Sequence, residues 1–194
     1  MACTRAGPVT VPLLMLLIWA GNAFAQPSSE RLAACAACHG PGGNSHIAQF
    51  PSLAGQPKLF IENQLVLIRE GLRDIPAMKE VMTGMGDEEI VTLASYYAAQ
   101  PTAPATGLVD AQKHRLGEET ARKMLCGTCH LGDYSGQRQV PRLAGQNEEY
   151  LLQSMKQFRD HPGPGRDTIM AAALYGLSDA DLANLAHYLA RFKR

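Results

Sequence analysis

Hydrophobic positions recur every three to four residues along most of this chain, with little alternation of period two. This spacing is typical of amphipathic helices. It is clearest in residues 58–71 and 147–160. Two further segments, opening at Asp87 and Ser178, place acidic residues where the dipole of a helix favours negative charge, and apolar residues follow at helical spacing. The pattern therefore predicts an all-α protein.

The same order of features occurs twice, in residues 30–100 and 121–193. A Cys-x-x-Cys-His pentapeptide, a Pro-x-Leu-Ala-Gly-Gln hexapeptide and a methionine-containing segment before an acidic helix start recur at nearly constant offsets. Such self-similarity indicates repeated domains. Residues 101–107 are rich in proline and threonine, which predicts a stiff linker. We therefore expect a first domain in 26–100 and a second in 108–194.

Residues 1–25 differ in composition from the rest of the chain. Arg5 precedes an apolar run, 9–20, and a small-residue site that ends at Ala25. These features predict a signal peptide cleaved after Ala25, with which Cys3 would be lost. An uncleaved anchor is the alternative. The run is too short for a hydrocarbon core of ~30 Å, and the small-x-small site also disfavours an anchor.

Both cysteine pairs are followed directly by histidine, in residues 35–39 and 126–130. Cys-x-x-Cys-His is the attachment pattern of c-type haem, in which the thiols bond the haem vinyl groups and the histidine ligates the iron. Two complete motifs predict two covalently bound haem c groups, one in each half. The residues expected to bind them are Cys35, Cys38, His39, Cys126, Cys129 and His130.

Other uses of the cysteine pairs explain the sequence less well. A zinc ribbon has its second pair about 15 to 20 residues after the first, whereas each pair here belongs to its own repeat. A thioredoxin-like dithiol accompanies a βαβ pattern, which this chain lacks. Disulfides within the pairs would close very short loops, gain little from chain entropy and leave the repeated histidines without a role.

The sixth iron ligand decides the function of a haem, because a methionine sulfur fills the open position and raises the reduction potential. In the second half we expect Met170, which lies in the predicted loop before the closing helix, well after His130. Met155 falls on a predicted helix, where a core role is favoured. The predicted iron ligands of the second haem are thus His130 and Met170.

Three methionines compete in the first half, and the repeat ranks them. Aligning the halves places Met78 on Met170, whereas Met82 and Met85 fall on leucines. We therefore predict His39 and Met78 as the iron ligands of the first haem. Met82 stays open as the alternative ligand. If Met78 is the ligand, Met82 and Met85 are expected to be apolar packing residues, as their leucine counterparts are.

Pro51 and Pro141 follow the two motifs at matching positions. Iron-binding histidines donate their other ring N–H to a carbonyl or carboxylate, so these prolines are candidates to supply the carbonyl, and simple turn residues are the alternative. The remaining histidines have no counterpart in the other half and are expected to be surface or structural residues. They are His46, His114, His161 and His187.

The formal net charge is zero, which gives no sign of a nucleic-acid partner or a polybasic membrane patch. Residues 26–104 contain five Lys or Arg against eight Asp or Glu, whereas residues 105–194 contain twelve against ten. The two halves therefore differ in sign. This difference predicts different docking partners at the two ends, with steering that salt weakens.

The doubled motif set resembles the dihaem class I cytochromes c of the cytochrome c4 family over nearly all of the mature chain. The resemblance implies two cytochrome c folds related by a pseudo-twofold axis, with His/Met ligation at both irons. It also favours Pro51 and Pro141 as the residues whose carbonyls accept the hydrogen bonds of the iron-binding histidines. The sequence departs from the family pattern at 131–133, after the second motif, and at Gly86, where the second half has Ser178.

What the resemblance implies for function is a monomeric periplasmic electron carrier and not an enzyme. Its partners would be redox proteins: an electron-donor complex and a terminal oxidase or other acceptor, met in transient association with membrane complexes. A cytochrome subunit of a periplasmic dehydrogenase is the alternative. A haem peroxidase or gas sensor, which needs an open sixth position, is disfavoured by the two predicted methionine ligands.

Overall fold

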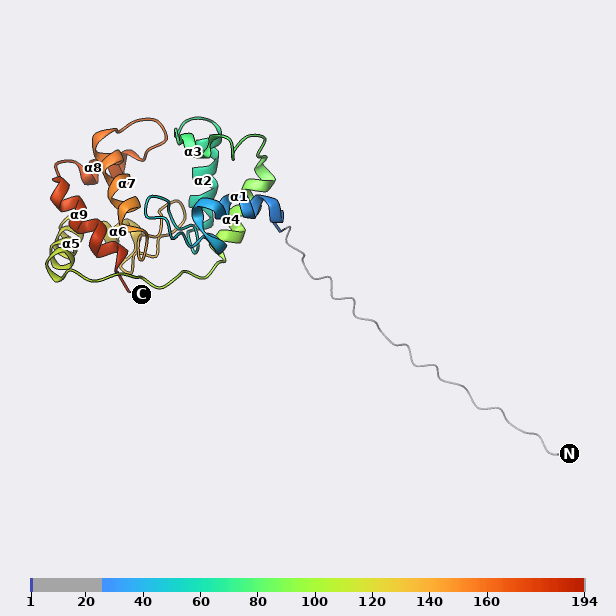
Figure 1. Ribbon diagram of the computed structural model, residues 1–194, viewed down its shortest axis with the longest axis horizontal. Helices are drawn as coiled ribbons and strands as arrows, with labels where there is room; N and C mark the ends of the chain where they lie inside the picture. Colours follow the sequence, from blue (N-terminus) through green and yellow to red (C-terminus); the bar gives the residue numbers. More distant parts are fainter. Residues whose placement is uncertain (2–25, 194) are drawn as a thin grey trace.

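Residues 26–193 form two helical domains that lie side by side in the computed structural model (Figure 1). Met1 is also described, whereas residues 2–25, where the predicted signal peptide and its cleavage site fall, and residue 194 lie outside the described residues. No helix of the described part is long and apolar enough to cross a membrane. Extended pairing within 26–193 is limited to one isolated bridge, Gln137 with Val140.

The first domain contains four α-helices and one short 3₁₀ helix. They are α1 (Ser29–His39), η1 (Pro41–Gly43), α2 (Lys58–Arg69), α3 (Pro76–Lys79) and α4 (Asp87–Ala98). The helices expected in 58–71 and from Asp87 are confirmed as α2 and α4, which pack against each other. Their shared core is small and includes Ile61, Ile90 and Leu93.

The second domain has a similar order, except that two helices take the place of α1 and the second of them carries the cysteine motif. It contains α5 (Ala111–Lys123), α6 (Cys126–His130), α7 (Glu148–Asp160), α8 (Thr168–Leu174) and α9 (Asp179–Ala190). The helices expected in 147–160 and from Ser178 are confirmed as α7 and α9. Both α5 and α7 pack on α9, so the core of this domain is built around the apolar face of the last helix.

The linker segment is fixed to the first domain by one asparagine. The Asn44 side chain donates to the Pro101 carbonyl (3.0 Å) and accepts from the Ala103 N–H (2.7 Å). Asn44 belongs to the sequence that follows the first cysteine motif, so the same loop that leaves the motif also holds the start of the linker. The stiffness expected from its prolines stays a prediction.

The second domain holds the other end of the linker through α9. Arg191 donates to the Leu108 carbonyl (2.7 Å), and the buried His187 accepts the Asp110 N–H at Nε2 (3.0 Å). Acceptance at Nε2 places the proton of neutral His187 on Nδ1, which faces a Glu148 carboxylate oxygen at 3.3 Å. His187 therefore has the structural role expected of it. The limits 26–100, 101–107 and 108–194 remain our proposed domain boundaries.

The sequence after the second motif departs from the family pattern, but its backbone makes the same hydrogen bonds as the matching loop of the first domain. In the first domain the Gly43 carbonyl accepts the N–H groups of Leu53 and Ala54. In the second, the Tyr134 carbonyl accepts the equivalent pair from Leu143 and Ala144, and Tyr134 takes a left-handed φ of 53°. A left-handed residue is tolerated here because its ring is buried against Tyr188 and Phe192.

The departure at Gly86 removes a helix cap. Ser178 forms a capping box with Asp181 at the start of α9, whereas Gly86 at the start of α4 supplies no side-chain bond. We expect Ser178→Ala to lower the free energy of unfolding of the second domain by about 1 kcal/mol, and Ser178→Asp to retain most of it. Thermal unfolding measured by circular dichroism checks this, and equal losses in both variants would contradict it.

Candidate functional site

His39 and His130 end the helices that carry the two cysteine motifs and are buried, each with 7% of its surface exposed. His39 Nδ1 lies 2.8 Å from the Pro51 carbonyl oxygen, and His130 Nδ1 lies 2.9 Å from that of Pro141. Because a carbonyl only accepts, each Nδ1 carries the proton and donates it. The prolines thus supply the carbonyls that the sequence left undecided, and each Nε2 keeps a lone pair available for a metal.

Burial also keeps both imidazoles neutral. It lowers the pKa of His39 and of His130, because the charged form loses its hydration, and the bond to the proline carbonyl opposes this only in part. The neutral imidazole is the form that ligates a metal. Both histidines are therefore in the protonation state and tautomer that an iron ligand requires.

The four cysteines of the described residues are free thiols in this structure. Cys35, Cys38 and Cys126 are partly buried, and Cys129 is exposed. Burial raises the pKa of Cys35 and of Cys126, so these two groups stay protonated at neutral pH. The thiols of each motif are thus available for bonding to an external group.

Met78 and Met170 occupy matching places, each as the third residue of a short helix, α3 or α8. The prediction that Met170 lies in a loop is wrong in this respect, because Asp167 caps α8 by accepting from the Met170 N–H (2.9 Å). Both methionines are partly buried. Met78 packs against the same core as Cys35, and Met170 against the same core as Cys126.

The competing methionines are buried more deeply. Met82 and Met85 each expose 4% of their surface inside the first core, and Leu174, which the repeat aligns with Met82, exposes 2% inside the second. Met155 is buried in the second core, as expected. Burial therefore groups Met78 with Met170, and it groups Met82 with a leucine.

The residues present fit a c-type haem in each domain. A neutral imidazole nitrogen, two free thiols and a partly buried thioether are the donors that covalent attachment and His/Met ligation require. In each domain the thioether borders the same apolar core as the first cysteine of the motif. Among the described residues, no cluster of three or more His, Cys, Asp or Glu offers a competing metal site.

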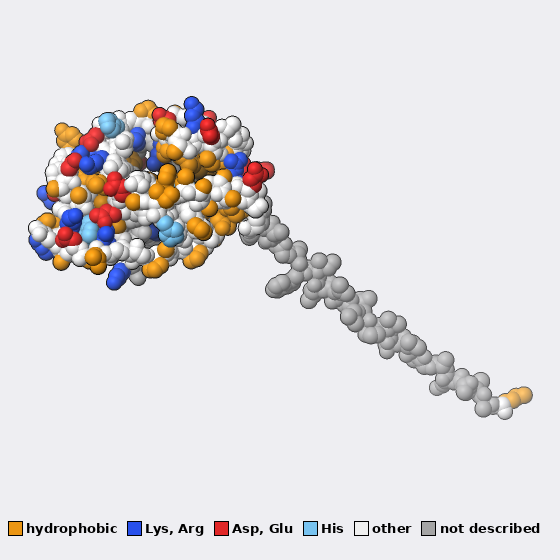
Figure 2. All heavy atoms as spheres, viewed as in Figure 1, with side chains coloured by type: hydrophobic (Ala, Val, Ile, Leu, Met, Phe, Trp, Pro, Cys, Tyr) orange, Lys and Arg blue, Asp and Glu red, His pale blue; other side chains and the backbone are white. Residues whose placement is uncertain are grey.

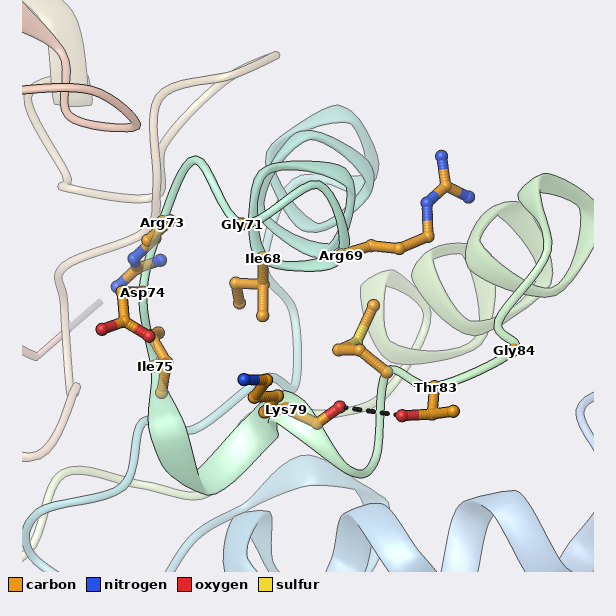
Figure 3. A pocket seen from close by; sticks show the side chains of 10 residues that line it. Ile68, Arg69, Gly71, Arg73, Asp74, Ile75, Lys79, Thr83 and Gly84 are labelled. Carbon is orange, nitrogen blue, oxygen red and sulfur yellow. Dashed lines mark hydrogen bonds between the residues drawn. The ribbon is translucent and has the colours of Figure 1, made fainter.

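A cavity of about 520 Å³ lies beside this arrangement in the first domain (Figure 3). It is bounded by the end of α2, the loop after it and the segment that follows α3, where Thr83 Oγ1 donates to the Lys79 carbonyl (3.3 Å). Its lining includes Arg69, Arg73 and Met82 but neither Met78 nor any motif residue. Of the candidate iron ligands, the cavity therefore borders only Met82, the alternative to Met78.

The histidines outside the motifs do not gather around either site. His46 and His161 are exposed, His114 packs edge-on against Tyr188, and His187 anchors the linker. These positions agree with the surface and structural roles expected from the sequence.

The segments that bind the two motif histidines face each other across the domain interface. Asn147 donates to the carbonyls of Ile47 (3.1 Å) and Phe50 (2.7 Å), close to the Pro51 that holds His39. Two glutamines, Gln56 and Gln146, also cross the interface. Both glutamines end the repeated Leu-Ala-Gly-Gln segment, which is the one signal of them in the sequence, but no sequence argument assigned them a partner.

A second contact joins the loops that precede the two methionine helices. Gly165, with φ of 75°, lies so close to the backbone of Leu72 and Arg73 that no Cβ would fit there. The domains thus meet both at the histidine side and at the methionine side. Figure 1 shows loops of the two domains approaching each other between α7 and α2.

Two family models match the chain, one in each half. Residues 23–96 match the model described as cytochrome C oxidase, cbb3-type, subunit III, and residues 115–193 match that of cytochrome c. The cytochrome c4 of Azotobacter vinelandii is 30% identical over 190 residues, which cover 88% of this chain and 89% of that protein.

Two further similarities cover most of the chain. The thiosulfate dehydrogenase electron acceptor of Thiomonas intermedia is 28% identical over 193 residues, 94% of this chain and 89% of that protein. The crystal structure of reduced cytochrome c4 from Pseudomonas stutzeri superposes with a TM-score of 0.78 at 26% identity and covers 88% of this chain and 100% of that one. The likeness therefore extends to both domains and to their arrangement.

Proposed function

Because this chain belongs to the cytochrome c4 family of dihaem electron-transfer cytochromes, with two covalently bound haem c groups, we propose that it is a periplasmic carrier of single electrons and not an enzyme. The observation that carries the proposal is the doubling of one complete donor set. Each domain presents a buried histidine fixed to a proline carbonyl, and a thioether on the rim of the same core as the first motif cysteine.

We assign the attachment and ligation residues by their matching positions. Cys35 and Cys38 hold the first haem, with His39 and Met78 as its iron ligands. The equivalent residues of the second domain are Cys126, Cys129, His130 and Met170. The burial of Met82 beside Met85 in the core supports Met78 over Met82.

The bound haem iron supplies one-electron redox chemistry, cycling between its ferrous and ferric states. The chain's own groups set the conditions for it. The carbonyls of Pro51 and Pro141 orient the imidazoles and make them better electron-pair donors to a metal. The thioethers of Met78 and Met170 would complete the coordination of the iron and favour its reduced state. An iron whose sixth position is filled by a thioether has no open position for a substrate. This supports electron transfer in which no bond of a substrate is made or broken.

The predicted signal peptide supports a periplasmic location, where covalent haem attachment and exposed redox partners are found together. We propose transient partners on the donor and the acceptor side, with the carrier itself a monomer. The charge difference between the halves supports unlike docking surfaces, and Figure 2 shows charged side chains gathered over the second domain while hydrophobic side chains cover much of the first on this face.

A second candidate is the dedicated electron acceptor of a dehydrogenase. It is favoured by the similarity to the Thiomonas intermedia thiosulfate dehydrogenase electron acceptor, which spans 94% of this chain. This reading keeps the same haem ligands and changes only the donor. Fast reduction of the pure protein by a sulfur-oxidising dehydrogenase, compared with reduction by a quinol-oxidising complex, distinguishes the two.

Carbon monoxide tests the proposed function itself. We expect that the reduced holoprotein does not bind carbon monoxide rapidly at either haem, because a thioether fills the sixth position of each iron. Stopped-flow absorbance after mixing measures this. Rapid binding at one haem would contradict the carrier and favour a peroxidase or a gas sensor.

A further inference from the structure

Each glutamine of the repeated Leu-Ala-Gly-Gln segment binds the backbone of the opposite domain with both atoms of its amide. Gln146 accepts the Ser52 N–H (2.8 Å) and donates to the Ser52 carbonyl (2.9 Å). Gln56 accepts the Arg142 N–H (2.9 Å) and donates to the Arg142 carbonyl (3.0 Å). Gln56 exposes 4% of its surface and Gln146 only 2%. Both side chains are therefore buried, and each is hydrogen-bonded through its oxygen and its nitrogen.

Each glutamine oxygen accepts the N–H of a peptide group whose carbonyl accepts the N–H of a motif histidine. The Ser52 N–H and the Pro51 carbonyl are the two ends of one peptide group, and that carbonyl accepts the proton of His39 Nδ1. The peptide between Pro141 and Arg142 does the same for His130. A continuous chain of hydrogen bonds therefore runs from each imidazole, through one peptide, to a glutamine of the other domain.

The arrangement is crossed and symmetric. Ser52 and Arg142 occupy matching places in the repeat, as do Gln56 and Gln146. Each domain gives a glutamine and receives one, as in an isologous interface between identical subunits. Because the whole set recurs in both directions, it is a built feature of the interface and not one chance contact.

Hydrogen bonds in such a chain polarise one another. A peptide whose N–H is accepted by an amide oxygen has a more negative carbonyl, which binds the imidazole N–H more strongly. A more strongly held N–H makes the imidazole a more basic ligand, and a more basic ligand favours ferric over ferrous iron. The glutamine thus acts on an iron that belongs to the other domain.

We propose that Gln146 is a positioning residue for the His39 haem and Gln56 for the His130 haem, so that each domain tunes the reduction potential of its neighbour through a shared peptide. The inference rests on the proposed function for the two histidine ligands. Docking of the domains then lowers the reduction potentials of both haems. Removing one of the two glutamines raises the reduction potential of one haem only.

The decisive variant is Gln146→Leu, made in the full haem-loaded protein. We expect the potential of the His39 haem to rise, up to a tenfold change in its ferrous-to-ferric ratio at fixed ambient potential, or about 59 mV. The His130 haem should keep its potential. In proton NMR of the reduced protein, the His39 Nδ1–H resonance should move upfield and exchange faster with solvent. Gln56→Leu should produce the mirror-image result at His130.

Two further variants separate this effect from a loosened interface. Asn147→Leu removes the side-chain bonds to the carbonyls of Ile47 and Phe50 across the same interface, but it keeps the bond between Gln146 and the peptide that joins Pro51 to Ser52. It should therefore leave the His39 resonance in place. Gln146→Glu keeps an acceptor oxygen for the Ser52 N–H and should not raise the potential, which also covers the case in which the leucine variant does not fold.

The outcomes are distinguishable from a failure of the proposed function. If the wild type lacks the Met–iron charge-transfer band, the ligand assignment is wrong. If that band is intact but Gln146→Leu shifts the His130 haem, both haems equally, or neither, the crossed tuning is wrong. A His39 resonance that responds alike to Gln146→Leu and Asn147→Leu would also overturn it.

Discussion

In the variant Met78→Ala, reduced protein binds carbon monoxide at one of its two haems, and about half of the Met–iron charge-transfer absorbance of the oxidised protein is lost. The reason is that Met78 is proposed as the sixth ligand of the first haem, and alanine leaves that position open. Removing the thioether also lowers the potential of this haem, because sulfur ligation favours the reduced state. Absorbance spectroscopy with a redox titration measures all three changes.

Met82→Ala is the matched control. Met82 lies in the first core with 4% of its surface exposed, so its truncation should cost about 2–5 kcal/mol of stability while leaving the charge-transfer band at full strength. A band halved by Met82→Ala and kept by Met78→Ala would reverse the ligand assignment. The same experiment on Met170→Ala, where Leu174 stands in the place of Met82, should affect only the second haem.

Replacing both cysteines of the second motif, Cys126→Ala with Cys129→Ala, should halve the haem content and unfold the second domain at ordinary temperature. Small domains bury a limited apolar area and often depend on a cofactor for their core. The apolar core beside Cys126 would lose the bound group that completes it. The haem-to-protein ratio and far-ultraviolet circular dichroism together measure the loss.

The equivalent double variant of Cys35 and Cys38 provides the control, since it should unfold the first domain and leave the second haem in place. Two outcomes would contradict the account. One is an unchanged haem content in either double variant. The other is a melting temperature of the wild type that falls on adding a thiol reductant, which would indicate structural disulfides.

The sequence predicted those features that depend on local pattern. The closing helices follow from acidic first turns and helical spacing, and α4 and α9 confirm them. The repeat aligned Met78 with Met170, and the two lie at the same place in matching short helices. The local pattern predicted a loop around Met170, and this was wrong, because Asp167 caps a short helix there, α8.

Features that depend on packing between distant segments could not be predicted from the sequence. The proline carbonyls stayed undecided until the fold placed Pro51 and Pro141 against the imidazoles. The partners of Gln56 and Gln146 depend on how two domains dock, and a pattern within one repeat carries no information on docking. The ion pairs of Arg69 with Asp87 and of Arg159 with Asp179 were missed for a different reason, since each joins two helices of one domain that lie apart in the sequence.

The central claim is that this one chain binds two haems, each held covalently. The intact mass of the purified mature protein, combined with the pyridine haemochrome absorbance per polypeptide, tests it most directly. We expect the mass of the chain starting at Gln26 plus two haem groups, and a haem-to-protein ratio of two, both unchanged after acid–acetone extraction. A ratio of one, or haem that the extraction removes, would contradict the account.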